Sequence, residues 1–179
     1  MAEYYYLSST LPMLDVDAEA PMSYQEFMDK CRQQMSKRDY RELETAVFTA
    51  AGDPKSSLMK KWQAYISHVD SYLAEERARK LGWNDEGAYT VLGTKDEVLA
   101  ERISRAVRTM NPLEGEEELL RIYFDFLKSN QTYDPFSRDS LMIYALQLQI
   151  IERKASFRME KGKAEFSRLF SELQKEFTN

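Results

Sequence analysis

The sequence holds one histidine, one cysteine and many carboxylates, and none of these residues stands in a catalytic or metal-binding pattern. The one histidine, His68, is not accompanied by a His-Glu-x-x-His motif or by paired cysteines, which a metal site built on it would need. The one cysteine, Cys31, lies four residues from both Phe27 and Met35, so it falls on an apolar helical stripe where a buried thiol acts as a small hydrophobe. We interpret both residues as structural and expect no metal or other cofactor.

Phosphate binding and acid–base catalysis also lack a motif. Loops that hold phosphate need clustered glycines, but Gly82, Gly87 and Gly93 open neither a Walker nor a dinucleotide pattern, and no Gly-x-Ser-x-Gly sequence occurs. The three glutamates at 116–118 fit the first turn of a helix, where the helix dipole favours negative charge. The sequence therefore predicts no catalytic residues. An enzyme stays an alternative that a pocket with converging carboxylates and arginines would favour.

The charge balance argues against nucleic acid as a partner. Thirty acidic residues against 25 basic ones give a net charge of −5, whereas generic nucleic-acid binding needs many Lys and Arg contacts to phosphate. Arg102, Arg105 and Arg108 follow one another at intervals of three, and a second basic cluster lies at 77–80. Because Glu101 stands four residues before Arg105, we interpret this stretch as a salt-bridged surface. The alternative is a docking patch for an acidic partner.

Length and composition predict one domain in a reducing compartment. A chain of 179 residues matches a single domain, and one cysteine cannot form an internal disulfide. The N-terminus lacks the basic and apolar regions of a signal peptide. The longest apolar run, from Leu141 to Leu146, is far shorter than the ~20 residues that cross a bilayer. We therefore expect a cytoplasmic protein without direct membrane insertion.

Prolines and capping residues divide the chain into an arm and a helical domain. Residues 1–22 carry Pro12 and Pro21 and are expected to form an extended or turn-rich arm, in which the tyrosines at 4–6 are the only β-like segment. Residues 23–179 are expected to form a single helical domain. No stretch has strand-like alternation, so the sequence predicts an all-α, multi-helix bundle. Helices are predicted from the capping box at 23–26, from 36–39 to about 51, from 53–54 to about 81, at 85–92, from the capping box at 94–97 to about 110, at 119–127, and from 134–137 onward.

The last predicted helix is unusually long. If it were continuous to Phe177 it would measure roughly 60 Å at 1.5 Å per residue, more than a compact domain of this size covers. Its apolar content thins over 152–165, which also contains Gly162. We expect this section to project or kink and to present a face to a partner; the alternative is two separate helices.

The candidates for a protein interface are aromatic and basic residues. Tyrosine is favoured in interfaces, and a tyrosine run stands on the expected arm, although we favour packing in the core for each of these residues. Basic residues come from the expected helix at 94–110 and from the projecting section. The full set is Tyr4, Tyr5, Tyr6, Arg102, Arg105, Arg108 and Arg158.

A resemblance to a known family rests on four short segments near the N-terminus. They read YYYLSSTLP at 4–12, SYQEF at 23–27, SKRD at 36–39 and DPK at 53–55, with an acidic stretch after the first. This order resembles an uncharacterised bacterial family with a Tyr-Tyr-Tyr-Leu-x-x-x-Leu-Pro signature, encoded in the operons of V-type (A/V-type) ATP synthases in Bacteroidetes and spirochaetes. Its members look like shortened relatives of the funnel-shaped stalk-to-rotor connector of these complexes, their C (or d) component.

The resemblance implies an all-helical, non-catalytic component that couples the central stalk to the membrane rotor ring during proton or sodium transport. It would be peripheral to the inner membrane through the complex, and the family offers no active-site residues to transfer. The full-length connector has three similar lobes, whereas this chain is about half as long and shows no clear repeat. It could thus form an incomplete socket, pair with another copy as a homo-oligomer, or serve another task at the same complex. The alternative is a soluble adaptor or assembly factor for the ATPase that is not part of the rotor.

Overall fold

The computed structural model describes residues 4–49, 56–83 and 96–157. These residues form seven helices and no strand, which confirms the predicted all-α fold. The helices are α1 (Tyr5–Thr10), α2 (Tyr24–Gln34), α3 (Lys37–Leu43), α4 (Ser57–Lys80), α5 (Glu97–Arg108), α6 (Pro112–Ser129) and α7 (Arg138–Ser156).

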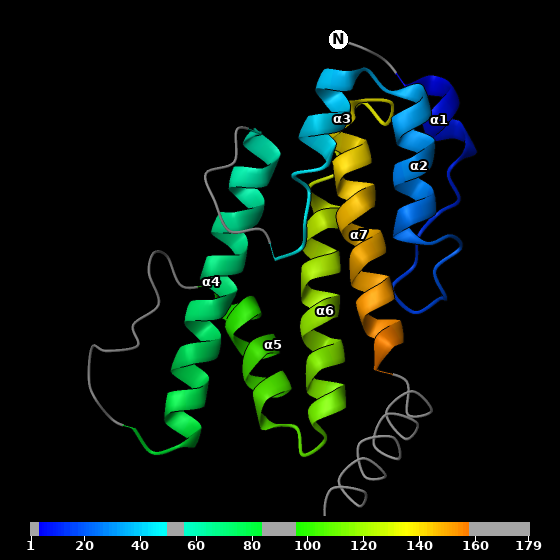
Figure 1. Ribbon diagram of the computed structural model, residues 1–179. Coiled ribbons are helices and arrows are strands. Elements are labelled where there is room, and N and C mark those ends of the chain that lie inside the picture. The colour runs from blue at the N-terminus through cyan, green and yellow to red at the C-terminus, as the bar shows by residue number, and fades with distance from the viewer. Residues whose placement is uncertain (1–3, 50–55, 84–95, 158–179) are drawn as a thin grey trace, which may run out of the picture.

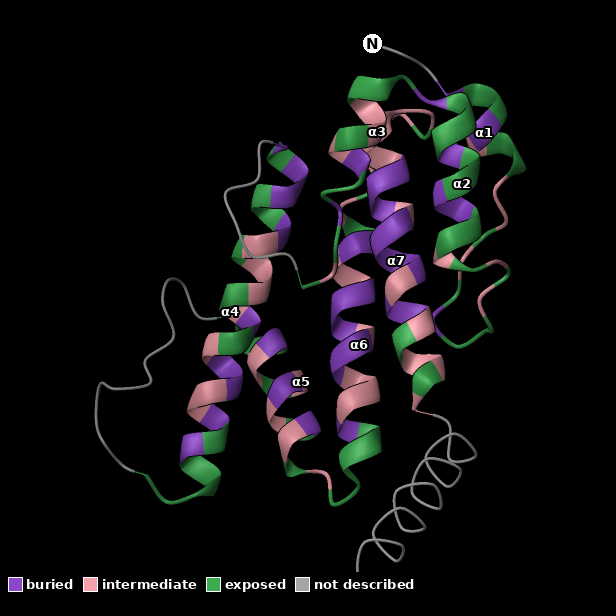
Figure 2. Cartoon of the chain, viewed as in Figure 1, coloured by how far each residue is buried: buried purple, intermediate pink, exposed green. Residues whose placement is uncertain are grey.

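Helices α6 and α7 form the antiparallel centre of the bundle (Figure 1). On one side α2 and α3 pack against α7, and α1 packs against α2; on the other side α5 packs against α6 and α4 against α5. Helix α7 is buried around nearly its whole circumference from Leu141 to Ile151 (Figure 2). A helix that is apolar on all sides must be enclosed by neighbours. One continuous cluster of buried residues therefore holds all seven helices together.

The starts of α2 and α3 follow the capping pattern predicted from the sequence. The Ser23 hydroxyl accepts a hydrogen bond from the Glu26 backbone N–H, and the Glu26 carboxylate accepts one from the Ser23 N–H at 2.8 Å, so the capping box is complete. Ser36 caps α3 by accepting from the Asp39 N–H at 3.1 Å. Helix α3 ends at Leu43, several residues earlier than expected.

Helix α7 begins within the predicted stretch at 134–137, whereas the cap of α5 is a later residue of the predicted capping box at 94–97. Asp96 caps α5 by accepting from two backbone N–H groups, and Ser137 caps α7. The expected helix at 85–92 and the residues 94 and 95 lie outside the described residues. Helix α4 ends as predicted before Gly82, whose φ of 72° suits glycine alone without strain.

Helix α6 is longer than the sequence suggested because it begins at Pro112 and not near 119. Asn111 caps it through its side-chain oxygen, and proline at the first helical position loses no hydrogen bond. Gly115 lies in the first turns, where α5 approaches closely: a Cβ at this position would stand 2.6 Å from the Ala106 carbonyl oxygen. Glycine is used here because two helix backbones nearly touch.

The N-terminal segment differs in part from the expected extended or turn-rich arm, because residues 11–23 are non-helical whereas residues 5–10 are helical. Residues 5–10 form the helix α1, and both Tyr4 and Leu7 are buried in the common core. The Tyr4 N–H donates to the Phe136 carbonyl at 2.8 Å, which fixes the start of this helix against the turn before α7. Burial of Leu7 outweighs the weak propensity of a six-residue helix. The segment is therefore part of the same domain as the rest of the described chain.

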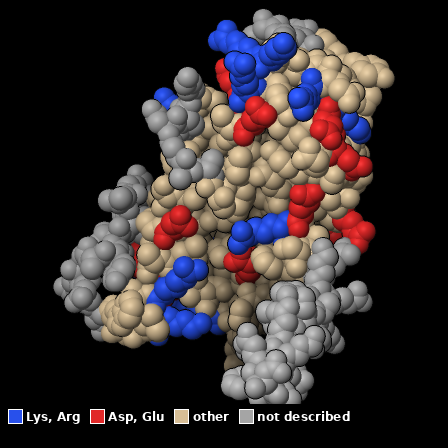
Figure 3. All heavy atoms as spheres, in the orientation of Figure 1, with Lys and Arg blue, Asp and Glu red and all other residues tan. Residues whose placement is uncertain are grey.

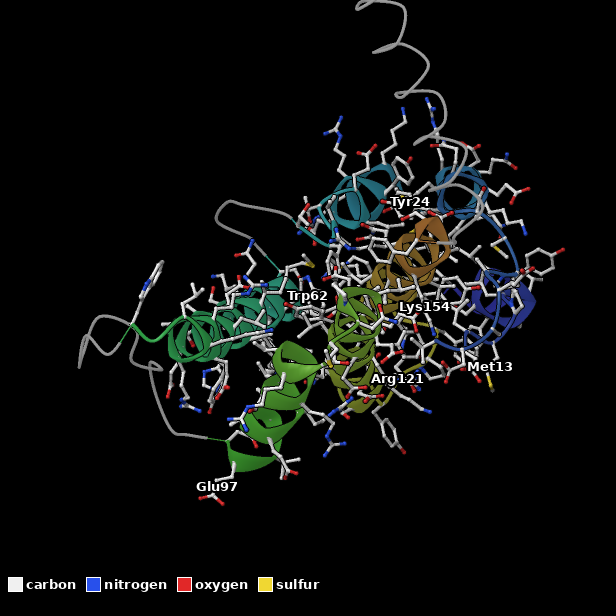
Figure 4. The ribbon with its side chains drawn as sticks, turned by 90° about the horizontal axis from the view of Figure 1, so that it is seen from below. Met13, Tyr24, Trp62, Glu97, Arg121 and Lys154 are labelled. Atoms are coloured by element: carbon white, nitrogen blue, oxygen red, sulfur yellow. The ribbon has the colours of Figure 1, made fainter. Side chains whose placement is uncertain are left out.

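Hydrogen bonds and ion pairs hold the segment between α1 and α2 against α6 and α7. Asp17 accepts two hydrogen bonds from the Arg121 guanidinium, at 2.7 and 2.8 Å, and one from the Lys154 ammonium at 3.0 Å. The Tyr144 hydroxyl donates to the Pro12 carbonyl at 3.0 Å. Arg121 and Lys154 lie next to each other when the molecule is seen from below (Figure 4). Bidentate pairing with arginine gives this contact a defined geometry.

Replacing Asp17 by asparagine is expected to reduce stability in a pH-dependent way. Hydrogen bonds from Arg121, then Lys154, lower the pKa of the Asp17 carboxyl from 3.8 to about 2. A carboxyl whose pKa is lower in the folded state stabilises the protein above its unfolded pKa, and this contribution is lost as the pH falls toward the folded pKa. Since the pair is largely exposed, we expect about 1 kcal/mol at pH 7. Urea unfolding of both proteins should show a difference that shrinks between about pH 4 and pH 2; a constant difference would contradict the assignment.

Helix α7 is described as far as Ser156, with Phe157 at its end. The predicted projection or kink over 152–165 falls mostly on residues 158–179, which lie outside the described residues. Arg158 and the question of continuity through Gly162 lie there as well.

Candidate functional site

A cleft of about 480 Å³ lies between α4 and α7, over the N-terminal half of α6. We call it the α4–α7 cleft. Buried and half-buried apolar side chains line its inner part, and charged or amide side chains stand at its mouth. The inner residues are Phe48, Ile66, Leu120 and Tyr123, and the outer ones are Gln63, Asp70, Glu116 and Arg153.

An aromatic cluster joins α4 to α6 behind this cleft. The Trp62 ring lies 5.8 Å from both Phe48 and Tyr123, measured between ring centroids, and Tyr65 stacks on Phe126 at 3.7 Å. Trp62 is only 1% exposed and stands between α4 and the centre of the bundle in Figure 4. Offset and edge-to-face contacts of this kind add to the stabilisation from burial. The cluster fixes the distance between α4 and α6, and so the width of the cleft.

Two acids and one arginine come together at the cleft from three helices. Arg153 of α7 donates to Glu116 of α6 at 2.9 Å, and its guanidinium lies 5.8 Å from the centre of the Phe48 ring. Asp70 of α4 is exposed at the same cleft, and none of the described basic groups pairs with it. Burial raises the pKa of the Tyr123 hydroxyl, with a contribution from the negative charge of Asp70. The cleft thus combines apolar and polar lining, and its described charged residues carry one net negative charge.

This arrangement suits a binding partner that presents an apolar side chain with a positively charged group next to it. The apolar inner part would take the side chain, and the uncompensated Asp70 would attract the positive charge. The cleft also combines carboxylates with an arginine, the feature that keeps an enzyme as an alternative. However, Glu116 is already held by Arg153. No group of histidine, cysteine or acidic side chains in the described ranges has the geometry of a metal site.

The tyrosine candidates divide between the core and the surface. Tyr4 is buried, while Tyr5 and Tyr6 are 54% and 74% exposed on α1. The Tyr5 ring still contacts Phe136, with 4.0 Å between the ring centroids. Tyr5 and Tyr6 are thus surface residues and Tyr4 is a core residue, so the three tyrosines do not form one interface patch.

The arginine candidates are salt-bridged, as expected for a surface of mixed charge. Arg102 donates to Glu118 at 3.1 Å and to Asp125 at 2.9 Å, and Arg105 pairs with Glu101 at 3.2 Å. Arg108 lies 3.8 Å from the Glu76 carboxylate, which is almost fully buried. These arginines lie on α5, away from α1, so the structure does not bring the two candidate groups together. Over the face shown in Figure 3, basic side chains gather mainly above α3 and at the lower end of α4.

His68 and Cys31 are structural residues. The His68 ring packs edge-on against Tyr72 with 4.9 Å between the ring centroids. Cys31 is fully buried, and burial raises the pKa of its thiol to about 12. At neutral pH this thiol is protonated and therefore a poor nucleophile.

The residues that carry the family resemblance also have structural roles. The Tyr4 hydroxyl donates to Asp39 at 2.5 Å, and Asp39 also accepts from the Ser36 hydroxyl at 2.9 Å. The hydrogen bond from Tyr4 is the main cause of a lowered pKa of the Asp39 carboxyl. This network ties the first signature segment to the one at 36–39. The signature thus describes how the upper end of the bundle is built.

No family model matches this sequence, and its comparison with curated proteins and with solved structures finds no significant match. Among the described helices, none combines the length and the apolar character that a bilayer-spanning segment requires.

Proposed function

We propose that this chain is a non-catalytic subunit of a V-type (A/V-type) ATPase that couples the central stalk to the membrane rotor during ion transport. The N-terminal signature supports the assignment to this complex through its resemblance to the bacterial family. An all-helical body is also what the resemblance to the stalk-to-rotor connector implies. The chain would lie at the cytoplasmic side of the membrane and reach it only through the other subunits.

The observation that carries a binding role is the α4–α7 cleft. It leaves apolar side chains open between two helices, beside Asp70, with which none of the described basic groups pairs. Exposed apolar surface of this kind favours binding to another protein, a role that requires no catalysis. We propose that a helix of a neighbouring ATPase component inserts an apolar side chain there, next to a lysine or arginine that faces Asp70.

Co-purification tests this proposal. The tagged chain would be expressed in its own cell, the membranes solubilised gently, and the captured proteins identified and quantified. The proposal predicts recovery of the rotor ring and central-stalk subunits in near-equal amounts. Capture of assembly intermediates alone would favour the alternative, a soluble adaptor or assembly factor. A chain found free in the cytosol, without ATPase subunits, would contradict both.

A further inference from the structure

A second cavity, of about 470 Å³, lies between α6, α7 and the segment that follows α1. We call it the arm cavity, because residues 8–14 form one of its walls. Its other walls come from α6 and α7 and from the turn between them. The apolar lining includes Leu11, Leu14, Phe124 and Ile143. A concave, mostly apolar site of this volume is of the size that holds a small organic ligand.

Polar groups without protein partners line the same cavity. Gln147 is only 6% exposed, yet no other described residue hydrogen-bonds to its side-chain amide. The Ser8 hydroxyl oxygen is buried and also lacks a hydrogen-bond partner in the described chain. A buried polar group without a partner costs about 1–3 kcal/mol, so such groups are usually satisfied by a ligand or by water. The Ser8 hydroxyl is such a group on this cavity, and it marks a place where an oxygen atom of a ligand would be held.

The charge of the cavity defines the ligand further. Lys128 lines it from the last turn of α6, and none of the described carboxylates forms an ion pair with its ammonium group. None of the described residues that line the cavity is acidic. Within the described chain, the polar lining side chains without a hydrogen-bond or ion-pair partner are thus one cation, two amides and one hydroxyl: Lys128, Gln131, Gln147 and Ser8. Each of them can donate to an anionic oxygen.

From this combination we propose that the arm cavity binds a single-chain organic anion, such as a medium-chain carboxylate. The apolar walls receive the chain, and Lys128, Gln147 and Ser8 supply donors to the carboxylate. Because residues 8–14 form a wall, a bound ligand would also hold the N-terminal segment in place. This site is separate from the α4–α7 cleft, so its failure would leave the proposed function untouched.

Titration of the purified full-length chain with decanoate tests the proposal, with decyltrimethylammonium as a probe of equal chain length and opposite charge. We expect decanoate to raise the melting temperature in a saturable way and to bind at least about tenfold more tightly than the cation, since a charge-assisted hydrogen bond contributes at least that factor.

Two substitutions and a control locate the site. Lys128→Glu and Gln147→Leu should each weaken decanoate binding about tenfold while the helix content and cooperative unfolding are retained. Lys60→Glu, an exposed charge reversal on α4, should leave binding unchanged. The proposal is overturned if decanoate causes no shift, if both probes bind equally, or if the Lys128 variant binds like the natural protein.

Discussion

Replacement of Trp62 by alanine is expected to lower the free energy of unfolding by about 3–5 kcal/mol, the largest effect of any single change discussed for this protein. Trp62 is 1% exposed and touches Phe48, Tyr123 and Phe126, so its removal leaves a cavity at the joint between α4 and α6. Phe48 lies in the segment after α3 and the other two rings lie on α6, so they cannot close that cavity without moving α4. Urea unfolding followed by circular dichroism would measure the loss.

Two further variants make this test specific. Trp62→Phe keeps most of the ring contacts and removes the indole N–H, which is buried without a partner in the described chain, so it should cost much less than the alanine change. Tyr133→Ala removes an aromatic ring that is fully exposed and should change stability by less than about 0.5 kcal/mol. A Trp62→Ala protein as stable as the Tyr133 variant would show that α4 is not held by this cluster.

The second large effect concerns binding and not stability. Reversing the charge of Asp70 with lysine should reduce the recovery of ATPase subunits about tenfold or more, because a basic partner residue would then face a like charge, which costs several kcal/mol. Asp70 is exposed, and no described residue pairs with it, so the fold should tolerate the change. The measurement is quantitative co-purification, with the melting temperature recorded for each variant.

The matched control for this experiment is Asp29→Lys. Asp29 is an exposed acid on α2, far from the cleft in sequence and on the other side of α7, and its charge reversal is chemically identical. We expect this variant to recover the subunits like the natural chain. If both variants lose the subunits equally, net charge and not the α4–α7 cleft governs the interaction. If neither loses them, the cleft is not the binding surface.

Features that depend on nearby residues could be predicted from the sequence. The capping box of Ser23 and Glu26 needs only residues three apart, and it is present as expected. The helix predicted from 53–54 to about 81 is present as α4, and Leu58, Trp62 and Val69, which follow one another at helical spacing, lie in the core. The period of an amphipathic helix is a local property, and tertiary packing did not override it here.

Features that depend on contacts between distant segments could not be predicted. The helix α1 forms because Tyr4 and Leu7 are buried against residues far away in the sequence. No local sequence pattern predicts such a contact. The cleft likewise brings together Asp70, Glu116 and Arg153 from three helices. In the sequence, the glutamates at 116–118 indicated only the first turn of a helix. The one local signal was the mixed polar and apolar face that Ile66 and Asp70 share at a spacing of four residues. The signature tyrosines were candidates for an interface, with packing in the core favoured for each, and Tyr4 lies in the core.

Ion transport in membrane vesicles tests the coupling role most directly. Inverted vesicles would be prepared from cells that lack this chain and from cells in which it is restored, and ATP-driven ion uptake and ATP hydrolysis would be measured in parallel. The proposed role predicts that vesicles without the chain lose ATP-driven uptake and that restoring the chain recovers it. Uptake and hydrolysis that stay fully coupled in the absence of the chain would contradict the role.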